Sequence, residues 1–191
     1  NLFYQRGIHL GLILMLAYLL FPIAKRAWIR WPVDAAFLAA SLGTTGYLVF
    51  NLDNLINRQG FWTQTDVWVS VLGTIVVLEA ARRVIGPTIS VIGIVFIVYA
   101  MIGPRGPLDM ITLPGILEHR GYDVGRIVTQ LFLTQEGIFG LPLGVAATFV
   151  YIFVPFGATL EITGAAQFFI TLAHALARRQ RGGPAKASVI A

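Results

Sequence analysis

The 191-residue sequence contains no cysteine and few charged residues, which make up 12% of the chain. Without cysteine the chain can form no disulfide and offers no thiolate ligand to a metal. Soluble domains carry about twice this charged share, typically about 25%. Hydrophobic residues make up 57% of the chain, and a water-soluble protein of this length could not bury so much apolar surface in one core. The composition therefore excludes most soluble classes.

Catalytic motifs are also missing from the sequence. It contains no HExxH, GxSxG or P-loop pattern, and the isolated positions of His9, His119 and His174 give no support to a metal site. The net charge of +5 does not indicate nucleic-acid binding, because the basic residues form no continuous tract. We therefore expect a protein that is not an enzyme and has no catalytic residues, metal ligands, bound cofactor or nucleic-acid partner.

Most of the sequence consists of long uncharged apolar runs. A helix that spans the bilayer needs roughly 17 to 25 apolar residues, since each residue rises about 1.5 Å through about 30 Å of hydrocarbon. We predict an all-α fold, that of a polytopic helical integral membrane protein in contact with the lipid bilayer. About five transmembrane helices are expected, with amphipathic interfacial helices beside them, and the predicted spans are residues 7–24, 33–52, 61–81, 84–103 and 137–160.

The basic residues predict the orientation of these spans. Nine of the fourteen lie in three short segments, namely Lys25, Arg26 and Arg30, then Arg82 and Arg83, then Arg178, Arg179, Arg181 and Lys186. Short loops rich in lysine and arginine stay on the cytoplasmic side of a membrane. The segments 53–66 and 105–136 are therefore predicted to lie on the opposite, periplasmic side, and residues 61–81 are predicted to run inward.

Two further segments have the pattern of amphipathic helices. The first precedes the fifth span, with apolar residues at helical spacing from Val124 to Phe132. The second is residues 162–177, where one polar stripe faces an apolar side. The stripe favours a helix along the cytoplasmic interface over a helix that crosses the bilayer, and both alternatives remain open. The stripe consists of Gln167, Thr171, His174 and Arg178.

A few residues are candidates for specific roles. The spacing of Glu79, Arg82 and Arg83 lets the carboxylate pair with either guanidinium on one helix face. This predicts an interfacial ion pair, with a contact to a neighbouring domain or an anionic lipid headgroup as the alternative.

Pro142 and Pro155 remove backbone hydrogen bonds inside the fifth span, so together with Gly157 they predict a kink or hinge. Close helix packing is the alternative role of such glycines.

Several motifs together resemble a known transporter family. They are EGIFGLPLGVAATFV at 136–150, FGATLEITGA at 156–165 and RGGPAK at 181–186, joined by LEAARRVIGP at 78–87 and HRGY at 119–122. This pattern resembles the permease of tripartite ATP-independent periplasmic (TRAP) transporters, in particular the fused small and large membrane subunit that is paired with receptors of the TAXI type. Pro155 departs from this pattern, which has an aliphatic residue there.

The resemblance implies a function and a domain organisation. It implies uptake of organic anions (carboxylates) across the bacterial inner membrane, driven by a sodium or proton gradient and supplied by a periplasmic solute-binding receptor. Residues 1–86 would be a small scaffold domain, incomplete at its N-terminus, and residues 87–191 the start of a large elevator-type permease domain. The substrate and ion sites are expected beyond Ala191. The alternative is a scaffold subunit of a membrane complex that does not itself transport.

Overall fold

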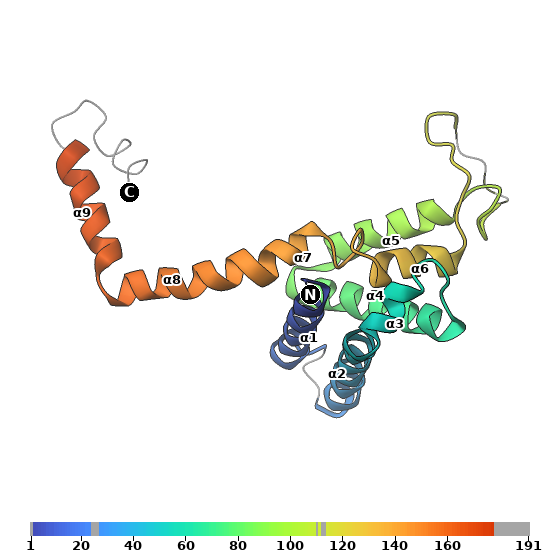
Figure 1. The fold of residues 1–191 in the computed structure, drawn as a ribbon, viewed down its shortest axis with the longest axis horizontal. Helices are drawn as coiled ribbons and strands as arrows, with labels where there is room; N and C mark the ends of the chain where they lie inside the picture. Colours follow the sequence, from blue (N-terminus) through green and yellow to red (C-terminus); the bar gives the residue numbers. More distant parts are fainter. Residues whose placement is uncertain (1, 24–26, 110, 112–113, 178–191) are drawn as a thin grey trace. The chain divides into compact units, whose positions relative to one another are not determined.

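The computed structural model describes residues 2–23, 27–109, 111 and 114–177, and this part of the chain is helical apart from its links (Figure 1). It contains no strand within these residues, only one isolated bridge between Ile102 and Leu108. The predicted all-α class is confirmed. The elements are α1 (Leu2–Leu20), α2 (Ala27–Phe50), α3 (Leu52–Asn57), α4 (Gln64–Val84), α5 (Pro87–Met101), α6 (Val124–Leu133), α7 (Leu141–Val145), the π-helix η1 (Ala146–Val150), α8 (Tyr151–Ile162) and α9 (Ala165–Ala177).

Each predicted span overlaps a helix in the described residues, with ends that differ by a few positions. Three segments are long and apolar enough to cross a membrane by length and composition, namely Leu2–Leu20, Arg30–Phe50 and Leu141–Ile162. Of the two other predicted spans, α4 has 21 residues and α5 has 15. The chain is a membrane-embedded helical protein. The basic residues Lys25, Arg26, Arg178, Arg179, Arg181 and Lys186, and the hairpin expected from Ala185, lie outside the described residues.

The chain divides into two compact units, Asn1–Gly144 and Val145–Ala191. This division reflects packing within each unit, so the boundary predicted after residue 86 stays a prediction. In the second unit, Gly164 makes the turn between α8 and α9 with φ +75°, a backbone conformation that residues with a side chain rarely adopt. The first unit contains the buried hydrophobic core.

Helices α1 and α2 pack closely because two glycines on α1 face α2. A Cβ atom on Gly7 would lie 3.2 Å from side-chain atoms of Leu48 and Val49, and one on Gly11 would lie 3.0 Å from Oγ1 of Thr45. The two glycines are four residues apart and so share one helix face. Small residues at this spacing let two helices approach within a membrane, where the hydrophobic effect does not drive them together.

Helix α4 is the centre of the first unit, since α1, α2, α5 and α6 all pack against it. Its buried face is partly polar. Ser70 donates a hydrogen bond to the Asp66 carbonyl at 2.7 Å, and Thr74 donates one to the Ser70 carbonyl at 2.8 Å. Each hydroxyl is thereby satisfied within its own helix, which a polar group surrounded by helices and lipid requires.

The amphipathic helix predicted before the fifth span is present as α6. Its buried side includes Ile127, Val128 and Phe132, which are three of the residues that carried the prediction. The ring of Phe132 is fully buried and lies over Gly73 of α4, so closely that a Cβ atom on Gly73 would overlap the ring. Gly73 therefore sets the distance between α4 and α6.

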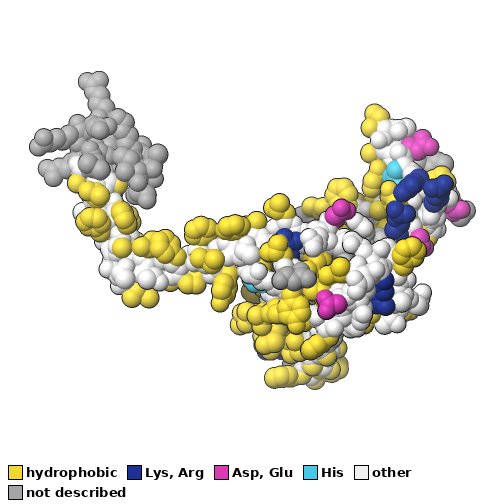
Figure 2. Space-filling view, viewed as in Figure 1, with side chains coloured by type: hydrophobic (Ala, Val, Ile, Leu, Met, Phe, Trp, Pro, Cys, Tyr) yellow, Lys and Arg dark blue, Asp and Glu magenta, His cyan; other side chains and the backbone are white. Residues whose placement is uncertain are grey.

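Apolar side chains cover much of the outer surface of the helices (Figure 2). Water would disfavour an exposed apolar surface of this extent, whereas lipid chains do not. On α5, exposed apolar residues occur on several sides of the helix, as expected for a helix surrounded by lipid or by further helices. They are Ile89, Val91, Ile92, Ile94, Val95, Phe96 and Val98.

Substituting Gly73 tests the packing of α4 on α6. Gly73→Ala should destabilise the purified transporter by about 1–3 kcal/mol, because the added methyl group forces the Phe132 ring out of its place. The matched control is Gly43→Ala, since nothing lies within 4 Å of a Cβ atom there. Thermal unfolding in detergent measures both variants. Equal melting temperatures for the two would contradict the close contact.

Candidate functional site

Arg83, near the C-terminal end of α4, is the centre of a buried charge cluster. Its Nη1 donates to Oδ1 of Asp34 on α2 at 2.5 Å, and its Nε donates to Oε1 of Glu79 at 2.8 Å. The Arg83 side chain is 2% exposed. A buried guanidinium needs such partners, because removing a charge from water without them is unfavourable by several kcal/mol or more.

Aromatic rings complete the surroundings of Arg83. Its guanidinium carbon lies 4.8 Å from the ring centroid of Tyr18 and 5.2 Å from that of Phe37, within the range of cation–π attraction. The Tyr18 hydroxyl donates to the Val76 carbonyl at 2.6 Å. These contacts join α1 and α2 to one end of α4.

Arg82 differs from its neighbour, although both bind Glu79. Its Nε and Nη2 each donate to one carboxylate oxygen of Glu79 at 2.7 Å, in a bidentate pair. The Arg82 side chain is 44% exposed, so one face of its guanidinium is open. The structure thus brings the three predicted residues into one ion-paired group. A contact from this group to a neighbouring domain or headgroup stays a prediction.

A second buried charge lies near the opposite end of α4. Asp66 is completely buried and accepts hydrogen bonds from the Tyr47 hydroxyl at 2.7 Å and from Arg58 Nη2 at 2.9 Å. Its Oδ2 also accepts from the backbone N–H and the hydroxyl of Thr63 at 2.8 and 2.7 Å. Thr63 and Asp66 form a capping box that satisfies the start of α4.

Sequence reasoning missed Asp34 and the pair of Asp66 with Arg58. The spacing of Thr63 and Asp66 is a capping-box pattern and could have indicated a helix start there. Asp34 lies 49 residues before Arg83, and no local pattern connects two positions so far apart.

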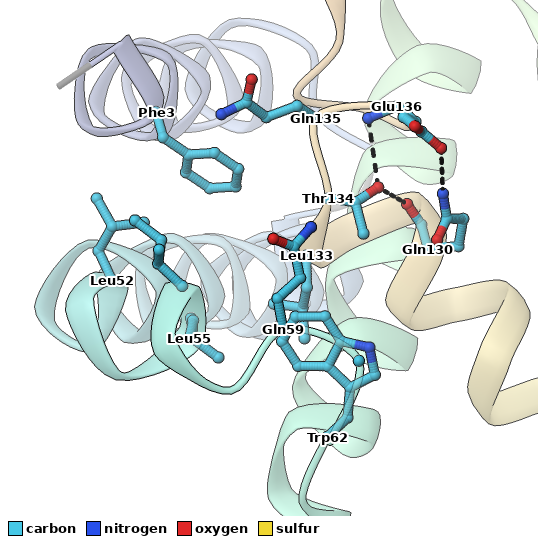
Figure 3. A pocket seen from close by; sticks show the side chains of 12 residues that line it. Phe3, Leu52, Leu55, Gln59, Trp62, Gln130, Leu133, Thr134, Gln135 and Glu136 are labelled. Carbon is cyan, nitrogen blue, oxygen red and sulfur yellow. Dashed lines mark hydrogen bonds between the residues drawn. The ribbon is translucent and has the colours of Figure 1, made fainter.

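A cavity of about 590 Å³ opens near the Asp66 end of the first unit (Figure 3). One wall is mostly apolar and comes from α1, α3 and the link before α4, with Phe3, Leu52, Leu55, Ile56 and Trp62 beside the polar Gln59. The other wall comes from the end of α6 and the residues after it, and it carries most of the polar groups. Gln130 Nε2 donates to Glu136 Oε2 at 2.7 Å, and Thr134 Oγ1 donates to the Gln130 carbonyl at 2.7 Å.

Glu136 is the charged residue among those that line this cavity. A carboxylate repels an anion, and no arginine or lysine of the lining offsets it. The cavity is therefore suited to neutral or cationic groups and not to an organic anion. Among the described residues, no group of three or more histidine, aspartate or glutamate side chains could hold a metal ion.

The predicted kink residues lie on both sides of an irregular stretch of helix. Pro142 belongs to α7 and Pro155 to α8, and between them the chain forms the π-helix η1. A π-helix in an otherwise α-helical segment is a local irregularity, often found where a helix has a functional role. Gly157 has nothing within 4 Å of its Cβ position in the described chain. Whether these residues act as a hinge stays a prediction.

Together these features define a polytopic helical membrane protein in which the buried charged groups join its helices. Residues 72–191 match the family described as "Tripartite ATP-independent periplasmic transporter, DctM component". The match covers more than half of the chain, and the chain belongs to this family. No curated protein and no solved structure matches it.

Family membership confirms the predicted class of function. The chain is a membrane component of a TRAP transporter, and its family is one of transporter components, not of enzymes. Membership also implies association with a periplasmic solute receptor and a small membrane subunit.

The two neighbouring arginines provide a matched test of the charge cluster. Arg83→Gln should destabilise the transporter by about 3–5 kcal/mol, because it leaves Asp34 and Glu79 without their buried partner. Arg82→Gln should cost about 0–1 kcal/mol, as expected for an exposed pair. Melting temperatures of the two purified variants in detergent give the comparison. A larger loss for Arg82→Gln would show that Arg83 is not the centre of the cluster.

Proposed function

We propose that this chain forms the scaffold and the first part of the transport domain of a secondary transporter that imports organic anions, specifically carboxylates. A sodium or proton gradient drives the uptake, and a periplasmic receptor of the TAXI type delivers the substrate. The uptake takes place across the bacterial inner membrane. The observation that carries this proposal is the family match over residues 72–191. The finer assignments follow from the sequence motifs around residues 136–186.

The described residues support the view that substrate binds elsewhere in the transporter. Organic anions need convergent cationic or amide groups near the midplane of the membrane. Here Arg58 and Arg83 are paired with carboxylates, Arg6 donates to a backbone carbonyl, and the cavity beside α3 is lined by a carboxylate. We propose that the substrate and coupling-ion sites lie outside the described residues, as the resemblance implies.

The charge cluster around Arg83 supports the proposal that residues 1–86 form the scaffold domain. Asp34, Glu79 and Arg83 all belong to residues 1–86, and they join α1, α2 and α4 into one body. This arrangement suits a scaffold that stays fixed during transport. Helix α6 belongs to residues 87–191, the proposed start of the large domain, and packs on α4, so this contact holds the start of that domain against the scaffold.

Reconstitution in proteoliposomes tests the proposed function. The transporter that contains this chain should accumulate a carboxylate only when a sodium or proton gradient and its cognate receptor are both present. The gradient supplies the free energy, so ATP added in place of a gradient should give no uptake. The matched control substrate is the uncharged amide of the same compound, which should not accumulate.

Three results would contradict the proposal. Uptake at the same rate without receptor, or uptake driven by ATP alone, would exclude the proposed mechanism. A protein that inserts and binds receptor, yet accumulates nothing under either gradient, would indicate the alternative of a scaffold without transport activity.

A further inference from the structure

Arg6 of α1 holds a segment of the chain that lies far away in sequence. Its Nη1 donates to the backbone carbonyl of Phe139 at 2.7 Å, across 133 positions of the chain. Phe139 belongs to the link between α6 and α7, which leads into the fifth predicted span. The contact therefore joins the first helix of the chain to the start of that span.

Aromatic packing strengthens the same contact. The rings of Phe3 and Phe139 are stacked with centroids 5.1 Å apart, and Phe132 of α6 meets Phe139 edge-on at 5.6 Å. Phe139 is completely buried. Its backbone carbonyl and its side chain are thus both held by neighbours in the first unit.

The Arg6 guanidinium packs directly against Gly144, which has no side chain to obstruct it. A Cβ atom on Gly144 would lie 2.5 to 2.8 Å from three atoms of the Arg6 guanidinium. Any larger residue at this position would displace the guanidinium. We call the contact set of Phe3, Arg6, Phe139 and Gly144 the α1 pin.

The role of Arg6 differs from that of Arg58 and Arg83. Both of those have a carboxylate within 4.0 Å, whereas within the described ranges Arg6 has none. Like Arg58 Nε and Arg83 Nη2, its buried Nε lacks a hydrogen-bond partner there. Arg6 is half-buried, and a guanidinium held without a carboxylate contributes little to stability. Its hydrogen bond to the backbone carbonyl of a distant segment therefore suits a positioning role.

The helix becomes irregular directly after the α1 pin. The π-helix η1 begins at Ala146, two residues beyond Gly144, and ends at Val150. Further on, Pro155 lacks the N–H that would bond to the Tyr151 carbonyl four residues earlier. Wide turns and missing backbone bonds are the identifiable causes of helix bending. The stretch of this segment that bends most easily, Ala146–Val150, thus begins two residues after Gly144, where the contacts with α1 end.

We propose that Arg6 is a positioning residue, which pins residues 137–144 to α1 so that the helix bends at Ala146–Val150 during transport. This proposal rests on the proposed transport function. It assigns the bending to the π-helical stretch and leaves the α1 pin closed throughout the cycle.

Cross-linking tests whether the α1 pin stays closed. Cysteines at Phe3 and Phe139 can be bridged by a short bis-thiosulfonate reagent, and this chain has no cysteine that would compete. Uptake is measured in the transporter that contains this chain, before and after bridging. The bridged protein should keep most of the uptake of the unbridged double variant. A loss that a reductant reverses would show that the α1 pin must open, and would overturn the proposal.

Substitutions provide a second test that does not need a cross-link. Gly144→Ala and Arg6→Gln should each lower the maximal uptake rate about tenfold, because the first displaces the guanidinium and the second removes it from the Phe139 carbonyl. The KM for substrate should not change, because neither residue touches it. The double variant should be no slower than the slower single variant, since both changes open the same contact. The control Gly43→Ala, with nothing near its Cβ position, should keep the original rate.

The outcomes separate this proposal from the proposed function. No uptake by the unmodified transporter under any gradient would defeat the proposed function itself. Normal gradient-driven uptake with independent, multiplying losses in the double variant would leave that function intact and overturn the role of the α1 pin. A rise in KM for either single variant would do the same.

Discussion

The arrangement of the first unit depends on satisfying the charges at both ends of α4. Asp66 and Arg83 are 17 positions apart in the sequence, which corresponds to about 25 Å along a helix. This separation approaches the thickness of the hydrocarbon core, about 30 Å. Each charge is buried and each is paired, Asp66 with Arg58 and Arg83 with Asp34 and Glu79. The sequence predicts that α4 crosses the bilayer, and the partners of its charged ends come from the protein.

These pairs also place the neighbouring helices. Asp34 fixes α2 against the Arg83 end, and Tyr47 fixes the same helix against the Asp66 end. Helix α6 then packs over Gly73, between the two ends. A body held at both ends is suited to be the stationary part of a transporter of the TRAP family, and the irregular helix after Gly144 is suited to be a part that moves.

The sequence predicts the parts of this structure that depend on neighbouring residues. The run lengths predict the helices, the periodicity around Ile127 predicts the buried side of α6, and the spacing of Glu79 to Arg82 and Arg83 predicts their pairing. The contacts of Arg83 with Asp34 and of Arg6 with Phe139 join residues 49 and 133 positions apart. Such contacts depend on how helices pack, and no spacing within a single helix contains that information.

The orientation predicted for α4 places its Asp66 end outside the membrane and its Arg83 end inside. Single cysteines at Phe61, Ile85 and Ile116 replace exposed side chains, and an impermeant thiol reagent added to intact cells reports the side on which each lies. The predicted result is labelling at Phe61 and Ile116 and none at Ile85, which follows α4, until the membrane is permeabilised. Labelling of Ile85 in intact cells, with Phe61 protected, would contradict the orientation of α4. Labelling of all three would show that α4 does not cross.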